Sequence, residues 1–146
     1  DANSTEVNPN TPYPIIHIMP EQEEYLKKRR YGGTIRLGAW PCEIKKDSIL
    51  GKAYLKKTIF ERHRHRYEVN NDYRELLEKN GMSISGASPD NQLVEAIELS
   101  QKLHPFFVGT QFHPEYQSRP LSPHPVFLAF LKAATQHKTW QKNKTL

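Results

Sequence analysis

The spacing of apolar residues along the chain predicts a series of short strands. Apolar or alternating runs indicate strands at residues 14–19, 34–40, 42–44, 82–85, 92–99 and 106–112. In the second run, Ile35 and Leu37 are expected to face the core and Arg36 the solvent. The break at Trp40-Pro41 separates it from the third. The nearly continuous apolar run at 106–112 is typical of a strand covered on both faces.

Helical spacing is found in two places. Residues 73–80 carry Tyr73, Leu76 and Leu77 on one face, with Asp72 as the expected cap and Gly81 as the expected stop. Phe127, Phe130, Leu131 and Ala134 predict a second helix over residues 126–136. We therefore expect one domain over residues 1–136 and a polar, frayed tail over residues 137–146.

Composition narrows the function classes. The 146 residues carry a net charge of +5, 36% hydrophobic residues and a single cysteine, Cys42, and their mean hydropathy is −0.77. These values argue against a membrane span, a disulfide scaffold and a zinc module. A reducing, cytoplasmic setting is predicted. The chain begins at Asp1 without a signal-peptide pattern, so we expect a cut start.

The first candidate for chemistry is the pair His113 and Glu115, at the end of the predicted buried strand. Residues i and i+2 of an extended chain point the same way, so the carboxylate can orient the imidazole as in a nucleophilic triad. Open α/β sheets place their sites at such strand ends. The alternative is a strand-to-turn junction with a solvated histidine and glutamate.

A second candidate is the basic run ERHRHRYEVN, Glu61 to Asn70. In an extended chain Arg62, Arg64 and Arg66 share one side, and the planar fork of arginine suits a carboxylate or a phosphate. A solvated edge strand and a nucleic-acid patch are the alternatives. The bracketing glutamates and the single neighbouring aromatic argue against nucleic acid.

Cys42 is the third candidate. It could complete a triad with His113 and Glu115, but Pro41 precedes it and no glycine flanks it, unlike the elbow that carries a nucleophile in α/β enzymes. A packed structural thiol is the alternative.

Several motifs, taken in order, resemble the C-terminal part of the glutamine amidotransferase domain of CTP synthases. They are DANSTE (1–6), MPEQ (19–22), GGTIRLG (32–38), ERHRHRYEVN (61–70), ISG (84–86), LVEAIE (93–98), HPFFVGTQFHPEY (104–116) and SRP (118–120). The resemblance covers residues 1 to about 134. It implies a class I glutamine amidotransferase-like α/β fold, with a mostly parallel sheet flanked by helices, that lacks its first strands and its nucleophile elbow.

The resemblance also implies roles for residues. His113 looks like the triad histidine and Glu115 like the carboxylate that orients it. Glu6 resembles the acidic partner of the α-amino group of glutamine, and Arg66 resembles the arginine that holds its α-carboxylate. The family's nucleophilic cysteine lies upstream of DANSTE, so this segment is expected to be inactive alone.

CTP synthases use glutamine-derived ammonia and ATP to convert UTP to CTP, so the resemblance implies a synthetase domain as partner and a homo-oligomer, a tetramer in the family. It implies ATP, Mg²⁺, UTP and activating GTP for the complete enzyme, and we expect no cofactor in this segment. We expect neither nucleic acid nor membrane as a partner. The alternative function is a non-catalytic remnant that binds or regulates a partner chain. The presence of both HPE and Arg66 favours the enzyme.

Overall fold

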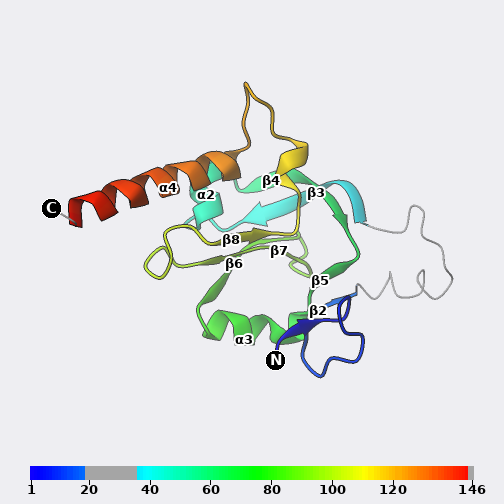
Figure 1. Ribbon diagram of the computed structural model, residues 1–146. Coiled ribbons are helices and arrows are strands. Elements are labelled where there is room, and N and C mark those ends of the chain that lie inside the picture. The colour runs from blue at the N-terminus through cyan, green and yellow to red at the C-terminus, as the bar shows by residue number, and fades with distance from the viewer. Residues whose placement is uncertain (19–35, 145–146) are drawn as a thin grey trace.

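The computed structural model describes residues 1–18 and 36–144, and the side chains of its last helix as far as His137 (Figure 1). The predictions for residues 19–35, including Ile35, lie outside the described residues. The strands are β1 (Asn3–Ser4), β2 (Pro14–Ile18), β3 (Arg36–Ile44), β4 (Thr58–His65), β5 (Tyr67–Val69), β6 (Met82–Ala87), β7 (Val94–Leu99) and β8 (Val108–Thr110). The helices are α2 (Ile49–Tyr54), α3 (Arg74–Lys79) and α4 (Pro125–Lys144), with 3-10 turns η1 (Asn71–Tyr73) and η2 (Pro114–Tyr116).

The larger sheet has the strand order β4-β3-β6-β7-β8, and each of its neighbouring pairs is antiparallel. A smaller sheet, β1-β2-β5, contains the parallel pair β1 and β2. The expectation of a mostly parallel sheet is therefore wrong for the described residues. The loops joining β6 to β7 and β7 to β8 span residues 88–93 and 100–107. They are too short for the crossover of a dozen or more residues that parallel neighbours need.

Strand β3 corrects two further predictions. It runs unbroken through Pro41. Within residues 1–18 and 36–144, β6 pairs with β3 at Glu43 and Ile44 and not at Pro41, and proline is tolerated where a strand lacks a partner on one side. Its inner and outer faces are also reversed at the start: Arg36 is buried and Leu37 is 49% exposed. The reason is an ion pair inside the sheet, between Arg36 and a carboxylate on β7.

The core lies on one face of the larger sheet, beneath α2 and α4, which lie side by side in Figure 1. It joins Cys42, Ile44, Ile59 and Ala96 of the sheet with Leu50, Phe112 and Val126. The sequence pattern did not predict α2. Its N-cap is Ser48, whose hydroxyl accepts from the Gly51 amide, and the Glu98 carboxylate accepts from the Ile49 amide.

The strand prediction for residues 106–112 is only partly confirmed. β8 spans three half-buried residues at the edge of the sheet, and Phe112 beyond it enters the core. By contrast, the hairpin predicted from residues 82–85 and 92–99 is confirmed by β6 and β7.

Helix α3 lies against β6, on the opposite side of the sheet from α2 and α4 (Figure 1). Asp72 does not cap it. The Asn70 side chain instead accepts from the Asp72 amide and starts η1, which leads into α3. The stop at Gly81 is confirmed, with φ of +94°.

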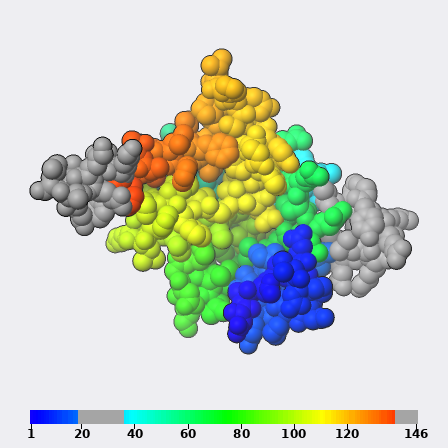
Figure 2. Space-filling model, viewed as in Figure 1, coloured from blue at the N-terminus to red at the C-terminus, as the bar shows by residue number. Residues whose placement is uncertain are grey.

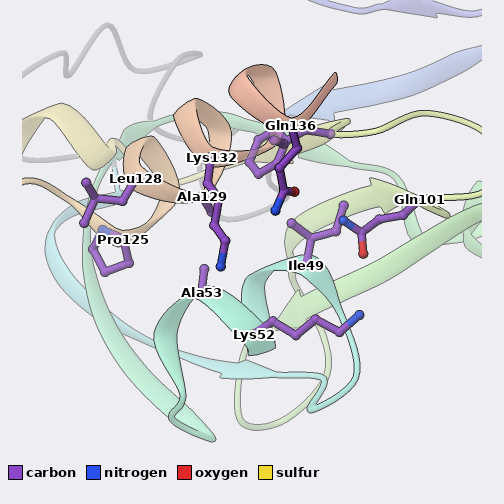
Figure 3. A pocket seen from close by; sticks show the side chains of 11 residues that line it. Ile49, Lys52, Ala53, Gln101, Pro125, Leu128, Ala129, Lys132 and Gln136 are labelled. Carbon is purple, nitrogen blue, oxygen red and sulfur yellow. The ribbon is translucent and has the colours of Figure 1, made fainter. Parts of the chain in front are cut away.

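Helix α4 extends eight residues beyond the predicted end and includes most of the expected tail. Its inner side packs beside α2, and Leu128, Ala129 and Lys132 line the groove between the two helices (Figure 3). Phe130 packs edge-on against Phe106, with ring centroids 5.6 Å apart. Leu131, in the predicted stripe, is 59% exposed. No helix in residues 1–18 and 36–144 has the length and apolar character to cross a membrane.

Candidate active site

The pair predicted from the HPE motif forms in the structure. His113 Nδ1 lies 2.7 Å from Glu115 Oε1, with the two side chains 37% and 54% exposed. The pair sits on η2 rather than on an extended strand, because Pro114 opens a 3-10 turn there. A carboxylate only accepts, so Nδ1 carries the hydrogen and Nε2 is the ring nitrogen that can take a proton. The hydrogen bond from His113 lowers the pKa of Glu115 below its usual range.

Strand β4 holds both ends of this turn. The His113 amide donates to the Arg62 carbonyl at 2.9 Å. At the other end, Gln117 Nε2 donates to the Phe60 carbonyl at 3.0 Å and to Glu61 Oε2 at 2.8 Å. The Tyr116 ring stacks on the His113 ring, with centroids 5.0 Å apart. The imidazole is therefore fixed by its own turn and by β4.

Glu61 is the centre of a buried network behind the turn. Its Oε1 accepts from the Tyr54 hydroxyl at 2.7 Å and lies 3.0 Å from His124 Nε2. Burial and the Glu61 carboxylate raise the pKa of Tyr54 well above its usual range. Because Tyr54 belongs to α2 and His124 precedes α4, one carboxylate links both helices to the strand beneath the HPE turn. The loop between η2 and α4, which carries the fully exposed Leu121, projects from the body (Figure 2).

The alternation predicted for the basic run is confirmed along β4 and ends with it. Arg62 and Arg64 are exposed, whereas His63 is 2% exposed. Arg66 lies at a bend between β4 and β5 and is half-buried. The expectation that Arg66 shares one side with the other two arginines assumed an extended chain through residue 66, whereas the strand ends at His65 and Arg66 lies at the bend.

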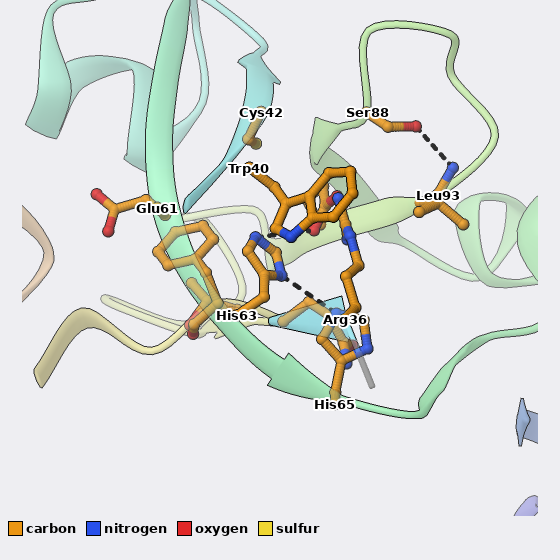
Figure 4. Close-up of polar contacts among 12 residues, drawn as sticks. Arg36, Trp40, Cys42, Glu61, His63, His65, Ser88 and Leu93 are labelled. Atoms are coloured by element: carbon orange, nitrogen blue, oxygen red, sulfur yellow. Dashed lines mark hydrogen bonds and ion pairs between the residues drawn. The ribbon is translucent and has the colours of Figure 1, made fainter. Parts of the chain in front are cut away.

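A buried charged cluster lies on the inner side of β4 (Figure 4). Arg36 Nη2 is 2.6 Å from Glu95 Oε1, the guanidinium lies 4.9 Å from the centroid of the Trp40 ring, and the Glu95 side chain is fully buried. His63 Nε2 is 3.6 Å from Glu95 Oε2. Burial raises the pKa of Glu95, although Arg36 opposes the shift.

The backbone carbonyl of Tyr67 determines the tautomers of His63 and His65, the two histidines of this cluster. His65 Nδ1 is 3.1 Å from the Tyr67 carbonyl, so it must donate. His65 Nε2 then accepts from His63 Nδ1 at 3.1 Å. Burial, followed by the Arg36 charge, lowers the pKa of His63 to about 3 and that of His65 to about 4. Both imidazoles are therefore neutral at pH 7.

Glu6 lies in the exposed turn after β1. The register pairs Ser4 with Ile16 and Ile18 with Tyr67, which places Glu6 and Arg66 at the same end of the small sheet, on strands separated by β2. The two proposed glutamine contacts thus share one end of a sheet.

Cys42 belongs to the core rather than to the site. It is fully buried, and burial raises the pKa of its thiol to about 12. A thiol that stays protonated at neutral pH is a poor nucleophile, which favours the structural interpretation. In the described part of the chain, no three His, Cys, Asp or Glu side chains are grouped so that they could hold a metal ion.

Comparison with known protein families shows to which family this chain belongs. The sequence profile of the family "Glutamine amidotransferase class-I" matches residues 23–133. The chain belongs to the class I glutamine amidotransferases.

CTP synthases are among the similar proteins of this family. The CTP synthase of Caldanaerobacter subterraneus is 57% identical over 132 residues, which are 90% of this chain and 24% of that protein. The CTP synthase of Rippkaea orientalis is 54% identical over 136 residues, covering 93% of this chain and 24% of the relative. The chain thus spans about a quarter of the length of these curated relatives, and its resemblance to CTP synthases is confirmed.

Solved structures agree on the fold. The glutaminase domain of Trypanosoma brucei CTPS with bound acivicin matches with a TM-score of 0.79 and 38% identity, over 93% of this chain and 51% of that one. A Thermoplasma acidophilum protein named as a GMP synthase subunit matches with a TM-score of 0.54 and 18% identity, over 74% of this chain and 48% of that one. The class I amidotransferase-like fold is therefore confirmed.

Sequence reasoning missed the residues that support the site from inside. Glu61 and Glu95 are nearly fully buried, and they hold the two networks beneath β4. The signal that could have found them was a glutamate at a core-facing position of an alternating strand, which is costly unless a partner meets it. His124 and Gln111 carried no such signal.

Proposed function

We propose that this chain is the C-terminal part of the glutaminase of a CTP synthase. The observation that carries the proposal is the 2.7 Å bond between His113 Nδ1 and Glu115 Oε1, found in a chain that matches CTP synthases over nine-tenths of its length. The bond leaves His113 Nε2 as a general base for a thiol, and Glu115 stabilises the imidazolium that forms.

In this proposal Glu6 and Arg66 hold the two charged groups of glutamine. A zwitterionic substrate needs an anion and a bidentate cation at a fixed separation. The shared sheet end of Glu6 and Arg66 supports this pairing. The nucleophile is not supplied by this chain, because its single cysteine is the buried Cys42. We therefore propose that the chain alone releases no ammonia from glutamine.

The released ammonia would pass to a synthetase domain for the ATP-dependent amination of UTP to CTP. We extend the proposal to Mg²⁺, activating GTP, assembly into a homo-oligomer and a cytoplasmic location, all by analogy with CTP synthases. The identity to the Caldanaerobacter CTP synthase supports this extension.

The test is a chimera in which this chain replaces the matching segment of the Caldanaerobacter CTP synthase. Glutamine-dependent and ammonia-dependent CTP formation are measured side by side. His113→Ala should abolish the glutamine-dependent reaction and leave the ammonia-dependent one largely intact, because free ammonia bypasses proton transfer at the thiol.

Arg66→Lys tests the substrate anchor. Losing one of two charge-assisted bonds should reduce kcat/KM for glutamine by roughly ten- to a hundred-fold, with ammonia use nearly unchanged. Arg64→Lys on the exposed face of β4 is the matched control. If Arg66→Lys leaves glutamine use unchanged, or reduces the use of both nitrogen sources alike, Arg66 does not anchor glutamine. A folded chimera that uses ammonia but never glutamine would favour the non-catalytic remnant.

A further inference from the structure

We propose that Gln111 is a positioning residue that sets the separation between Arg66 and His113, and thereby the length of the amide substrate that the site accepts. This inference rests on the proposed function, since it assumes that these two residues meet opposite ends of glutamine. It depends on hydrogen bonds that the carbonyl oxygen of Tyr67 accepts.

Gln111 joins the two segments that carry the site. Its side-chain Nε2 donates to the Tyr67 carbonyl at 2.9 Å, one residue beyond Arg66. Its backbone amide donates to the Glu95 carbonyl at 2.8 Å, which fixes Gln111 against β7. Because His113 follows two residues later along the same chain, the side-chain bond ties the bend at Arg66 to the segment that ends in the HPE turn.

The Tyr67 carbonyl is held from a second direction. His65 Nδ1 donates to the same oxygen at 3.1 Å, and His65 in turn accepts from the buried His63. A carbonyl oxygen has two lone pairs, so both are used. The bend between β4 and β5 is thus fixed both by its own strand and by Gln111, and the second of these bonds comes from the His113 segment.

A fixed separation would act as a length gauge for the substrate. Glutamine and asparagine carry the same α-carboxylate and side-chain amide but differ by one methylene. With the carboxylate at Arg66, asparagine would bring its amide carbon short of the His113 side by roughly 1 Å, a misplacement that can reduce rates about a hundred-fold. Removing the bond from Gln111 to the Tyr67 carbonyl should therefore reduce the rate with glutamine and reduce the difference in rate between glutamine and asparagine.

The experiment uses the same chimera with Gln111→Met, which keeps a similar length but removes the donor. Gln101→Met is the matched control, since the Gln101 side chain is exposed and its bond to the Pro105 carbonyl is 3.5 Å long. We expect kcat/KM for glutamine to fall roughly ten-fold. We also expect the ratio of asparagine to glutamine kcat/KM to rise at least several-fold, and ammonia-dependent CTP formation to stay unchanged. Gln111→Asn, which retains a shorter amide, should move the ratio in the same direction by less.

The outcomes separate the two proposals. If the unmodified chimera cannot use glutamine, the proposed function fails and the inference fails with it. If the unmodified chimera uses glutamine, three results would overturn the inference alone. These are a Gln111→Met variant that behaves like Gln101→Met, equal losses with glutamine and ammonia, and a loss of glutamine use with an unchanged asparagine-to-glutamine ratio.

Discussion

Mild acid should destabilise this chain through the two histidines of the buried cluster. The folded-state pKa values of His63 and His65 are lowered to about 3 and about 4, whereas the unfolded chain titrates near the usual 6.5. Below pH 6.5 the unfolded state therefore binds more protons than the folded state. Their contribution to the free energy of unfolding is present above pH 6.5 and is lost as the pH falls toward 4 and 3.

The magnitude follows from the width of that window. Between pH 6.5 and pH 5.0 the pH falls by about 1.5 units, and over this range each histidine lowers the free energy of unfolding by about 1.4 kcal/mol per unit. Together the two histidines lower it by about 4 kcal/mol. Glu95 acts in the opposite direction: burial raises its folded pKa, so its contribution is present at low pH and is lost as pH rises through that pKa. We expect a net loss of about 2 to 4 kcal/mol between pH 7.5 and 5.0.

Urea unfolding followed by tryptophan fluorescence measures this loss. Trp40 lies against Arg36 of the cluster, and Trp140→Phe makes Trp40 the sole reporter. His65→Gln should reduce the pH-dependent loss by about 2 kcal/mol, because one of the two titrations is removed. His104→Gln, on an exposed turn, is the control and should leave the loss unchanged.

A free energy of unfolding that changes by less than about 1 kcal/mol between pH 7.5 and 5.0 would refute the reasoning. So would a His65→Gln chain with the same pH dependence as its parent. The first result would mean that the cluster takes up protons without opening, for example onto Glu95 in place of His63. The second would mean that His65 is not a source of the pH dependence.

Two further predictions concern the backbone and the site. Gly51→Ala should lower the free energy of unfolding by at least about 2 kcal/mol in thermal or urea unfolding. The new Cβ would lie 2.3 Å from the Lys46 carbonyl oxygen, so the backbone must move. An unchanged unfolding midpoint would contradict the packing of α2. His113→Ala should raise the pKa of Glu115 toward its ordinary value, because the hydrogen bond from the imidazole is the main cause of its lowering; carboxyl ¹³C NMR titration measures this, and an unchanged pKa would show that the pair does not persist in solution.

The sequence predicted the positions of helices and strands better than it predicted which of their faces are buried. Alternation predicted a strand at residues 36–40, which belong to β3, but apolar Leu37 faces solvent and charged Arg36 faces the core. Periodicity assigns the apolar residues inward, and here a buried carboxylate on β7 reverses the choice by pairing with Arg36. The partner Glu95 lies 59 residues away, so no local pattern could reveal the pair.

Strand direction and caps were predicted less well, for different physical reasons. The parallel sheet was expected from family resemblance, whereas loop length determines that β6, β7 and β8 pair as antiparallel neighbours. Asn70 and Asp72 are both good capping residues, and the tertiary bond from Asn70 Nδ2 to the Pro14 carbonyl selects the first. The HPE pair needed no such information, because its two side chains are two residues apart on one turn.

The most informative departure from the sequence pattern concerns the backbone at Arg66. A regular alternation would place three arginines in a row on the exposed face of β4, where they would differ little from one another. The strand instead ends at His65, and both His65 and Gln111 hold the carbonyl of Tyr67 just beyond the bend. Arg66 thus differs from Arg62 and Arg64 in its backbone, because it lies at a bend and is half-buried, whereas the other two are exposed on a strand. If one arginine of the run holds a substrate carboxylate, this change of direction is the feature that can single it out, and one of the two bonds that fix it comes from Gln111, which lies outside the basic run.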